Sequence, residues 1–185
     1  MQATEVTECF SLESVVPFFQ PIMDLKQNSV WSYECLARLV TLNEHAYLPS
    51  DFLYLVERHD LVAELTQTIF NRSANYFRDI NVAWNINISQ SDMPDPNIHQ
   101  FFRSHLAHYP NPKRIAIEIT AQNALKESSK FATFATLCQS LGIRIIIDHF
   151  EQNVSDLQTI IALPISAIKI SASLFEQAQS QQDIA

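Results

Sequence analysis

The sequence predicts an α/β fold built around a mainly parallel sheet. Strand-like apolar runs alternate with segments of helical periodicity along most of the chain. Such alternation is typical of parallel strands joined by right-handed helical crossovers. The run from Ile143 to Asp148 is apolar almost throughout, as expected for a strand that is covered on both faces. Six strands can be counted, and both a doubly wound sheet and a barrel are compatible with the pattern.

The first half of the chain is predicted to hold three strands and three helices. The turn-forming residues 26–29 join the first two β-like runs. Pro49-Ser50-Asp51 resembles a capped helix N-terminus, and apolar residues recur at helical spacing after Asp60. The predicted elements are, in order, strands over 18–25 and 30–39, a helix opening at Pro49, a helix over 60–77, a strand over 82–88 and a helix ending near Tyr109.

The second half continues the alternation. Phe131, Phe134, Cys138 and Leu141 mark the buried stripe of a helix, which Gly142 terminates. The predicted elements here are a strand over 114–119, that helix, the strand over 143–148, a helix over 155–163 and a last strand over 167–170.

The composition is that of an ordinary globular domain, with 185 residues of which 47% are hydrophobic and 17% charged. A net charge of −8 argues against a nucleic-acid polymer as partner, because such binding needs a basic surface. The three cysteines, Cys9, Cys35 and Cys138, show neither disulfide nor zinc spacing. Gly142 is the only glycine, which excludes the glycine-rich phosphate-binding loops. Without a signal peptide or an apolar run of about 18 residues, we expect a cytoplasmic protein with no membrane segment.

Five polar residues lie at or near the ends of separate strand-like runs: Glu34, Asn87, Glu118, Asp148 and Lys169. A parallel barrel gathers such strand ends on one face, so these residues are expected to meet. Three carboxylates, an amide and a lysine at one rim suit a divalent metal ion and a phosphate ester.

Two short motifs stand in the first two strand-like runs, Phe19-Gln20-Pro21-Ile22 and Tyr33-Glu34-Cys35-Leu36-Ala37-Arg38. They resemble the opening of EAL domains, bacterial phosphodiesterases for cyclic di-GMP, with Glu34-Cys35-Leu36 in place of Glu-Ala-Leu. The resemblance covers residues 15–176, leaving 1–14 as an N-terminal extension and 177–185 as a polar tail. It implies a TIM-like (βα) barrel whose first strand is antiparallel, here incomplete with about six strands. The further matches are Asn87-Ile88-Ser89, Glu118-Ile119-Thr120, Asp148-His149-Phe150 and Lys169-Ile170-Ser171.

The resemblance also implies roles for individual residues. Lys169 resembles the lysine that orients the attacking water, and Gln20 and Arg38 match positions that contact the dinucleotide. Mg²⁺ or Mn²⁺ is the expected ion if any metal is bound, and no bound metal is the other expectation. The implied ligands of the first metal are Glu34, Asn87, Glu118 and Asp148.

The departures from the family motifs argue for lost catalysis. His149 stands where the family has a second metal-binding aspartate, and a neutral imidazole is a poor ligand for Mg²⁺. Ala121 and Ser171 also replace acids of the motifs, and residues 151–155 lack the glycines of the family loop. The family continues through two further strands, so six strands leave an open edge that we expect a protein partner or a second copy to cover.

These features predict a degenerate EAL-like module in cyclic di-GMP signalling that is non-catalytic and acts through protein–protein interaction or self-association. Two alternatives stay open. One is a receptor that binds cyclic di-GMP without cleaving it. The other is an active, metal-dependent phosphodiesterase that hydrolyses cyclic di-GMP to linear pGpG.

Overall fold

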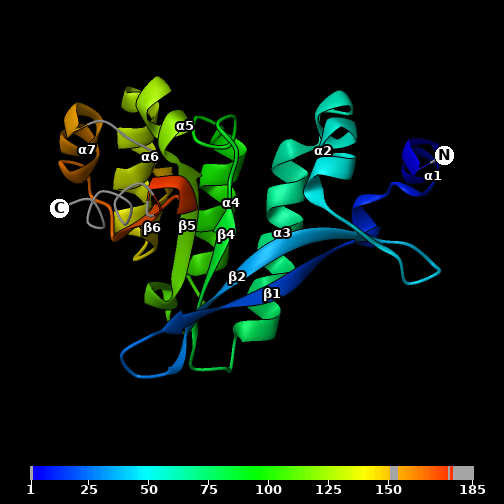
Figure 1. Cartoon of the computed structure of the whole chain (residues 1–185), viewed down its shortest axis with the longest axis horizontal. Coiled ribbons are helices and arrows are strands. Elements are labelled where there is room, and N and C mark those ends of the chain that lie inside the picture. The colour runs from blue at the N-terminus through cyan, green and yellow to red at the C-terminus, as the bar shows by residue number, and fades with distance from the viewer. Residues whose placement is uncertain (1, 151–153, 175, 177–185) are drawn as a thin grey trace.

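The structure is a computed structural model that describes residues 2–150, 154–174 and 176. Its centre is one curved sheet of seven strands with the order β1-β2-β4-β5-β6-β7, and β3 pairs with β2 beside this path (Figure 1). The strands are β1 (Val15–Asp24), β2 (Ser29–Val40), β3 (Ala46–Tyr47), β4 (Ala83–Asn87), β5 (Ile115–Thr120), β6 (Arg144–Phe150) and β7 (Ala167–Ile170).

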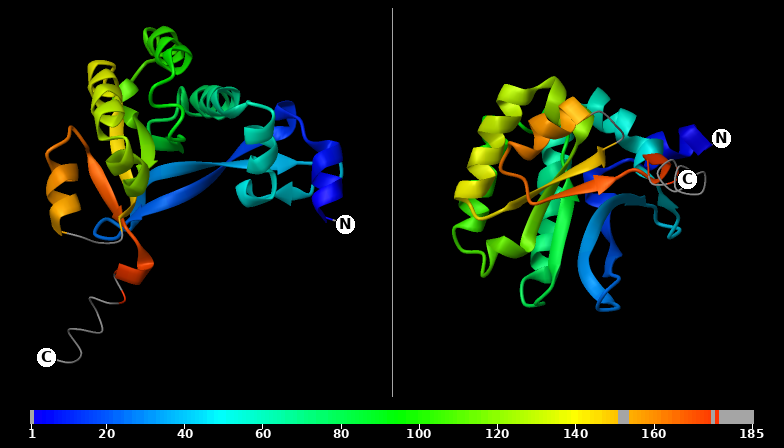
Figure 2. Two further views of the ribbon diagram at one scale, coloured as in Figure 1. Left: turned by 90° about the horizontal axis from the view of Figure 1, so that it is seen from above. Right: turned by 60° about the vertical axis from the view of Figure 1, so that its left-hand side comes forward.

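The helices lie along the sheet and cover one of its faces. Helix α3 packs on β1, β2 and β4, whereas α5 and α6 pack on β6 at the other end of the sheet (Figure 2). The helices are α1 (Gln2–Cys9), α2 (Pro49–Arg58), α3 (Val62–Phe77), α4 (Pro96–Leu106), α5 (Ala121–Lys126), α6 (Ser128–Ser140) and α7 (Val154–Ile161), with 3₁₀ turns η1 (Leu12–Ser14) and η2 (Pro112–Arg114). Among the described residues, no helix is long and apolar enough to cross a membrane.

The predicted fold class is confirmed: β1 is antiparallel to β2, and β2, β4, β5, β6 and β7 form parallel pairs. The sheet is the open counterpart of a TIM-like barrel, because β1 and β7 are its two ends and do not pair with each other. All six predicted strands are present, and the two-residue strand β3 is an addition that is too short to leave a sequence pattern.

Several predicted boundaries are wrong by a few residues. Strand β1 begins at Val15 rather than at residue 18, although it contains Pro17 and Pro21. Proline removes a backbone donor and is tolerated at a sheet edge, which is where β1 lies. Helix α4 ends at Leu106 rather than near Tyr109, and helix α5 was not predicted. The side chain of Thr120 caps α5 by accepting a hydrogen bond from the Asn123 backbone N–H.

The main core lies between the sheet and its helices and is rich in aromatic rings. Trp84 on β4 is fully buried, and Phe77 stacks on it at a centroid distance of 6.0 Å. Phe70 contacts the same indole at 5.5 Å. Val6 of α1 is also buried in this core. The opposite face of the sheet carries the polar residues Asn85, Glu118 and Lys169. Residues 151–153 of the predicted glycine-free loop and the predicted tail 177–185 lie outside the described residues.

Candidate functional site

The predicted strand-end residues Glu34, Glu118, Asn87 and Lys169 come together on the inner face of the sheet. The Lys169 ammonium lies 2.7 Å from Glu34 Oε2 and 2.5 Å from Glu118 Oε1. The Asn87 amide donates to Glu34 Oε1 at 2.9 Å. These contacts connect β2, β4, β5 and β7, and the parallel register sets Asn87 opposite Glu118. The expected convergence of these four residues is therefore present in the structure.

Glu118 is the most buried of these acids, with no exposure of its side chain. Burial is the main cause that raises the pKa of Glu118 to about 7, and the hydrogen bond from Lys169 acts in the opposite direction. Its Oε1 also accepts from the Asn85 amide at 2.7 Å, whereas its buried Oε2 has no hydrogen-bond partner among the described residues.

Asn85 is a site residue that the sequence analysis missed. It is fully buried, and its Oδ1 accepts a hydrogen bond from the Ser32 hydroxyl at 3.3 Å. Asn85 precedes Asn87 by two residues on β4, so the alternation of a strand places both amides on one face. That spacing was the signal that could have identified it.

The ionisation of Glu34 and Lys169 is coupled through their contact. Burial acts to raise the pKa of Glu34, but hydrogen bonds from Lys169 and Asn87 outweigh it, and the net pKa is lowered. Burial acts to lower the pKa of Lys169, yet its bonds to Glu118 and Glu34 raise it overall. Both groups are therefore charged near neutral pH, and their ion pair is only partly exposed to water.

Asp148 is engaged elsewhere, with its neighbour His149. Its Oδ1 accepts the His149 backbone N–H at 2.8 Å, and its Oδ2 lies 2.7 Å from His149 Nδ1. His149 has a φ of 52°, in the left-handed region, and the pairing of β6 with β7 is irregular there. The imidazole is 69% exposed. In the part of the chain that the structure describes, Asp148 forms no ion pair with the Lys169 ammonium.

The donor set suits a hard divalent ion chemically, because it consists of carboxylate and amide oxygens. The arrangement does not fit one. Within the described part of the chain, no group of three or more His, Cys, Asp or Glu side chains is placed to hold a metal ion. Glu34 and Glu118 both contact the Lys169 ammonium, and Asp148 is paired with the His149 imidazole.

The two predicted ligand-binding residues lie on the same sheet face as the acids. Gln20 on β1 is paired directly opposite Glu34, and Phe18 is opposite Leu36. The Arg38 guanidinium lies over the Phe18 ring at 5.8 Å and donates to the Ala37 carbonyl at 2.8 Å. Residues 34, 36 and 38 alternate with the buried Cys35 and therefore project from this face.

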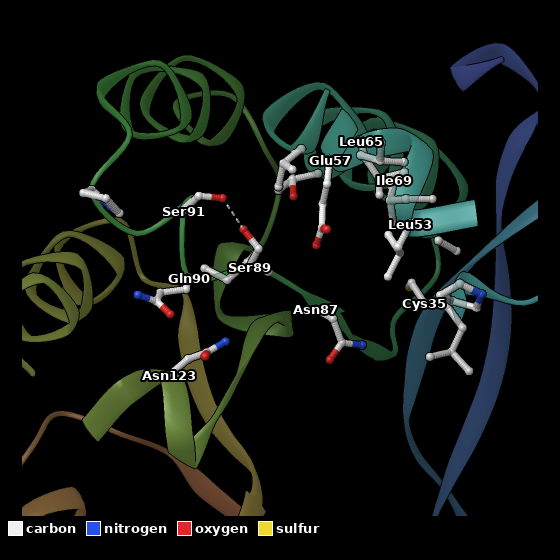
Figure 3. Close-up of a pocket in the computed structure, with 18 of the residues that line it drawn as sticks. Cys35, Leu53, Glu57, Leu65, Ile69, Asn87, Ser89, Gln90, Ser91 and Asn123 are labelled. Atoms are coloured by element: carbon white, nitrogen blue, oxygen red, sulfur yellow. Dashed lines mark hydrogen bonds between the residues drawn. The ribbon is translucent and has the colours of Figure 1, made fainter. Parts of the chain in front are cut away.

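A cavity of about 740 Å³ opens beside Asn87, between the strand ends and the helices α2 and α3 (Figure 3). Leu53, Leu65 and Ile69 give it an apolar side, and Ser89, Gln90 and Asn123 give it a polar side. Ser89 and Ser91 are joined by a hydrogen bond of 2.7 Å. The sequence analysis did not identify this cavity, because its lining comes from six separate segments. The lining residues include Cys35, Leu36, Ala37, Pro49, Leu53, Val56, Glu57, Val62, Leu65, Thr66, Ile69, Asn87, Ile88, Ser89, Gln90, Ser91, Pro94, Asn123 and Lys130.

The sequence model of the EAL domain matches residues 3–185, nearly the whole chain. The chain belongs to the EAL domain family. The family predicted from the motifs is thereby confirmed.

Two curated relatives and one solved structure are similar to this EAL domain. The chain is 25% identical over 187 residues to the signaling protein YkoW of Bacillus subtilis, covering 97% of the chain and 23% of that protein. It is 24% identical over 172 residues to the cyclic di-GMP phosphodiesterase PdeA of Borreliella burgdorferi, covering 89% of the chain and 26% of that protein. The FimX EAL domain of Pseudomonas aeruginosa, solved bound to cyclic di-GMP, superposes with a TM-score of 0.82 at 18% identity, covering 99% of this chain and 76% of that one.

The chain thus spans about a quarter of the length of these two curated relatives. The structural likeness at 18% identity supports the fold.

Proposed function

We propose that this EAL domain is a degenerate, non-catalytic module that binds cyclic di-GMP in the cavity beside Asn87 and signals through a protein partner or a second copy. The observation that carries the proposal is the position of that cavity, which is lined by Leu36 of β2 and Asn87 of β4 at the strand ends. Ligands of parallel α/β folds bind at the carboxyl ends of the strands. A volume of about 740 Å³ is within the usual range for ligand sites.

The chemistry of the walls is compatible with a cyclic dinucleotide, which carries flat purine bases and two phosphates. The apolar side of the cavity, with Leu53 and Ile69, suits the face of a base. Ser89 and Asn123 offer hydroxyl and amide groups to a base edge. Arg38 projects from the same face as Leu36 and can fork onto a phosphate oxygen.

The loss of catalysis is supported by the state of the acids. Cleavage by two metal ions needs anionic ligands that are free to clamp both ions. Both carboxylate oxygens of Asp148 are hydrogen-bonded to His149. His149 itself stands where the family motif has the second aspartate. The Glu34 and Glu118 side chains share one ammonium. Receptor function needs none of these groups to hold a metal.

Calorimetric titration with cyclic di-GMP, with and without Mg²⁺ or Mn²⁺, tests the proposal. We expect micromolar binding without metal and no linear pGpG by chromatography after prolonged incubation. Arg38→Ala should weaken binding by about tenfold, the loss typical of one charged hydrogen bond. Arg103→Ala, which removes an exposed guanidinium from α4, is the matched control and should change nothing.

Two results would contradict the proposal in different ways. Formation of pGpG with metal would show an active phosphodiesterase. Absence of cyclic di-GMP binding would leave the cavity without its proposed ligand and favour a module that acts only through protein contacts.

The output surface is proposed to be the outer edge of β7. Among the described residues, no strand pairs with that edge, and Ile170 on it is 63% exposed. Unpaired strand edges with apolar side chains recruit another strand or subunit. A protein partner or a second copy of the chain would complete the sheet there.

A further inference from the structure

Lys169 occupies the centre of the acid cluster rather than its margin. We infer that the Lys169 ammonium is the resident cation of this cluster, and that a divalent metal ion can bind only by displacing it. This inference concerns the acids alone and does not depend on cyclic di-GMP binding.

The first step is the geometry of the ammonium. Its nitrogen is 2.7 Å from Glu34 Oε2 and 2.5 Å from Glu118 Oε1, so it contacts both carboxylates at or below the usual length of a charge-assisted hydrogen bond. The Glu118 side chain is fully buried, and those of Glu34 and Lys169 are 18% and 29% exposed. Two carboxylates this close and this buried would repel each other without a cation between them.

The second step is the state of the remaining oxygens. Glu34 Oε1 already accepts from Asn87, and both oxygens of Asp148 accept from His149. Glu118 Oε2 is the acid oxygen of this cluster without a partner in the described part of the chain. Mg²⁺ demands near-octahedral oxygen ligation, so one free oxygen is insufficient while Lys169 stays in place.

The third step is that Lys169 has an advantage over a dissolved ion. It is tethered to β7, which the pairing of Ile147 with Ile168 holds against β6. A tethered group competes at a high effective concentration and loses no translational freedom on binding. A metal ion would also have to approach beside a positive charge unless the lysine side chain swings away.

Titration with Mn²⁺ alone, followed by the electron paramagnetic resonance signal of free Mn²⁺, tests the inference. We expect Lys169→Met to bind Mn²⁺ at least tenfold more tightly than the wild type. Lys169→Arg, which keeps the charge, should stay as weak as the wild type. Lys26→Met removes the same charge from an exposed turn and serves as the matched control. Equal affinity of the wild type and Lys169→Met, or weaker binding by the variant, would overturn the inference.

A measurement on the wild type keeps the inference testable should Lys169→Met fail to fold. Nitrogen-15 NMR detects lysine ammonium groups that are hydrogen-bonded and protected from exchange with water. We expect one protected ammonium signal, absent in Lys169→Arg, that is lost as millimolar Mg²⁺ is added. A Mg²⁺ titration that saturates a site while leaving that signal unchanged would show that metal and lysine coexist, which contradicts displacement.

Discussion

At the scale of residues, this chain buries two carboxylates, Glu118 and Asp92, that accept hydrogen bonds. Glu118 is bonded to Asn85 and Lys169, as described above. Asp92 is 1% exposed, and its Oδ2 accepts from the Ser89 backbone N–H at 2.8 Å and from the Thr66 hydroxyl at 3.0 Å. Among the described residues, the hydrogen-bond partners of Asp92 include no cation, so its charge is compensated less completely than that of Glu118.

The pH dependence of stability follows from Asp92. Burial raises its pKa above the ordinary value of 3.8, although its hydrogen bonds act to lower the pKa. A raised pKa in the folded state means that Asp92 contributes stability below about pH 3.8, and that this contribution is lost as the pH rises through the folded value. Asp92→Asn can keep both acceptor contacts through its amide oxygen while removing the buried charge.

We therefore expect the free energy of unfolding of Asp92→Asn at pH 7 to exceed that of the wild type by about 1 kcal/mol. The difference should vanish toward pH 3.5. Urea denaturation at a series of pH values measures it, and Asp79→Asn, at an exposed position, is the control. A variant less stable than the wild type at pH 7 would contradict the assignment.

At the scale of elements, the strand ends carry the unusual backbone. Strand β6 runs through Asp148 to Phe150, and its pairing with β7 is irregular between Ile147 and Phe150. At this irregularity His149 adopts a φ of 52°, a conformation that side chains with a Cβ disfavour by about 1 kcal/mol or more. This backbone turn brings His149 back to Asp148, so that both carboxylate oxygens of Asp148 are hydrogen-bonded to His149.

A pair of substitutions at position 149 tests this strain. His149→Gly and His149→Ala both delete the imidazole, so their difference reports the backbone alone. Because glycine accepts positive φ, we expect the glycine variant to be more stable than the alanine variant by about 1 kcal/mol. Thermal or urea unfolding measures the difference. At His59, where φ is −95°, we expect the alanine variant to be more stable than the glycine variant. If the glycine variant were the more stable one at both positions, strain at His149 would be contradicted.

At the scale of the whole molecule, the curvature of the sheet makes the site. Three strands separate β2 from β7 in the sheet order, yet Glu34 and Lys169 are in contact although they are 135 residues apart in sequence. The strands bend round so that the inner face closes on itself in part (Figure 2). The ion pair therefore joins the edge strand β7 to β2, the strand next to the opposite edge strand β1.

From the unpaired edge of β7 we expect the molecule to associate. We expect sedimentation velocity to show a shift to larger species as the protein concentration rises from about 1 to 100 μM. Ile170→Lys places a charge on the exposed edge and should return the protein to the monomer, because charged edge residues oppose strand pairing. Ile161→Lys, at an exposed position on α7 rather than on a strand, is the control. A wild type that remains monomeric throughout would count against self-association and leave a different protein as the proposed partner.

Much of the fold could be predicted because its signals are local. Each parallel strand is a short apolar run between helical segments, and Gly142, with a φ of 77°, ends a helix as expected. The boundaries of β1 could not be predicted, since Pro17 and Pro21 are acceptable only in a strand that lies at an edge. Asn85 was not predicted as a site residue, because its role depends on a hydrogen bond to Glu118 that only the tertiary structure shows.

The sequence by itself determined the family, the order of the strands along the chain and the convergence of Glu34, Asn87, Glu118 and Lys169, because strand ends of a parallel sheet meet on one face. Only the tertiary structure decided which of these side chains contact each other. The position of Lys169 between two acids, the turning of Asp148 toward His149 and the cavity beside Asn87 depend on sheet curvature and on distances of a few ångströms between distant segments. Local sequence patterns carry no record of such distances.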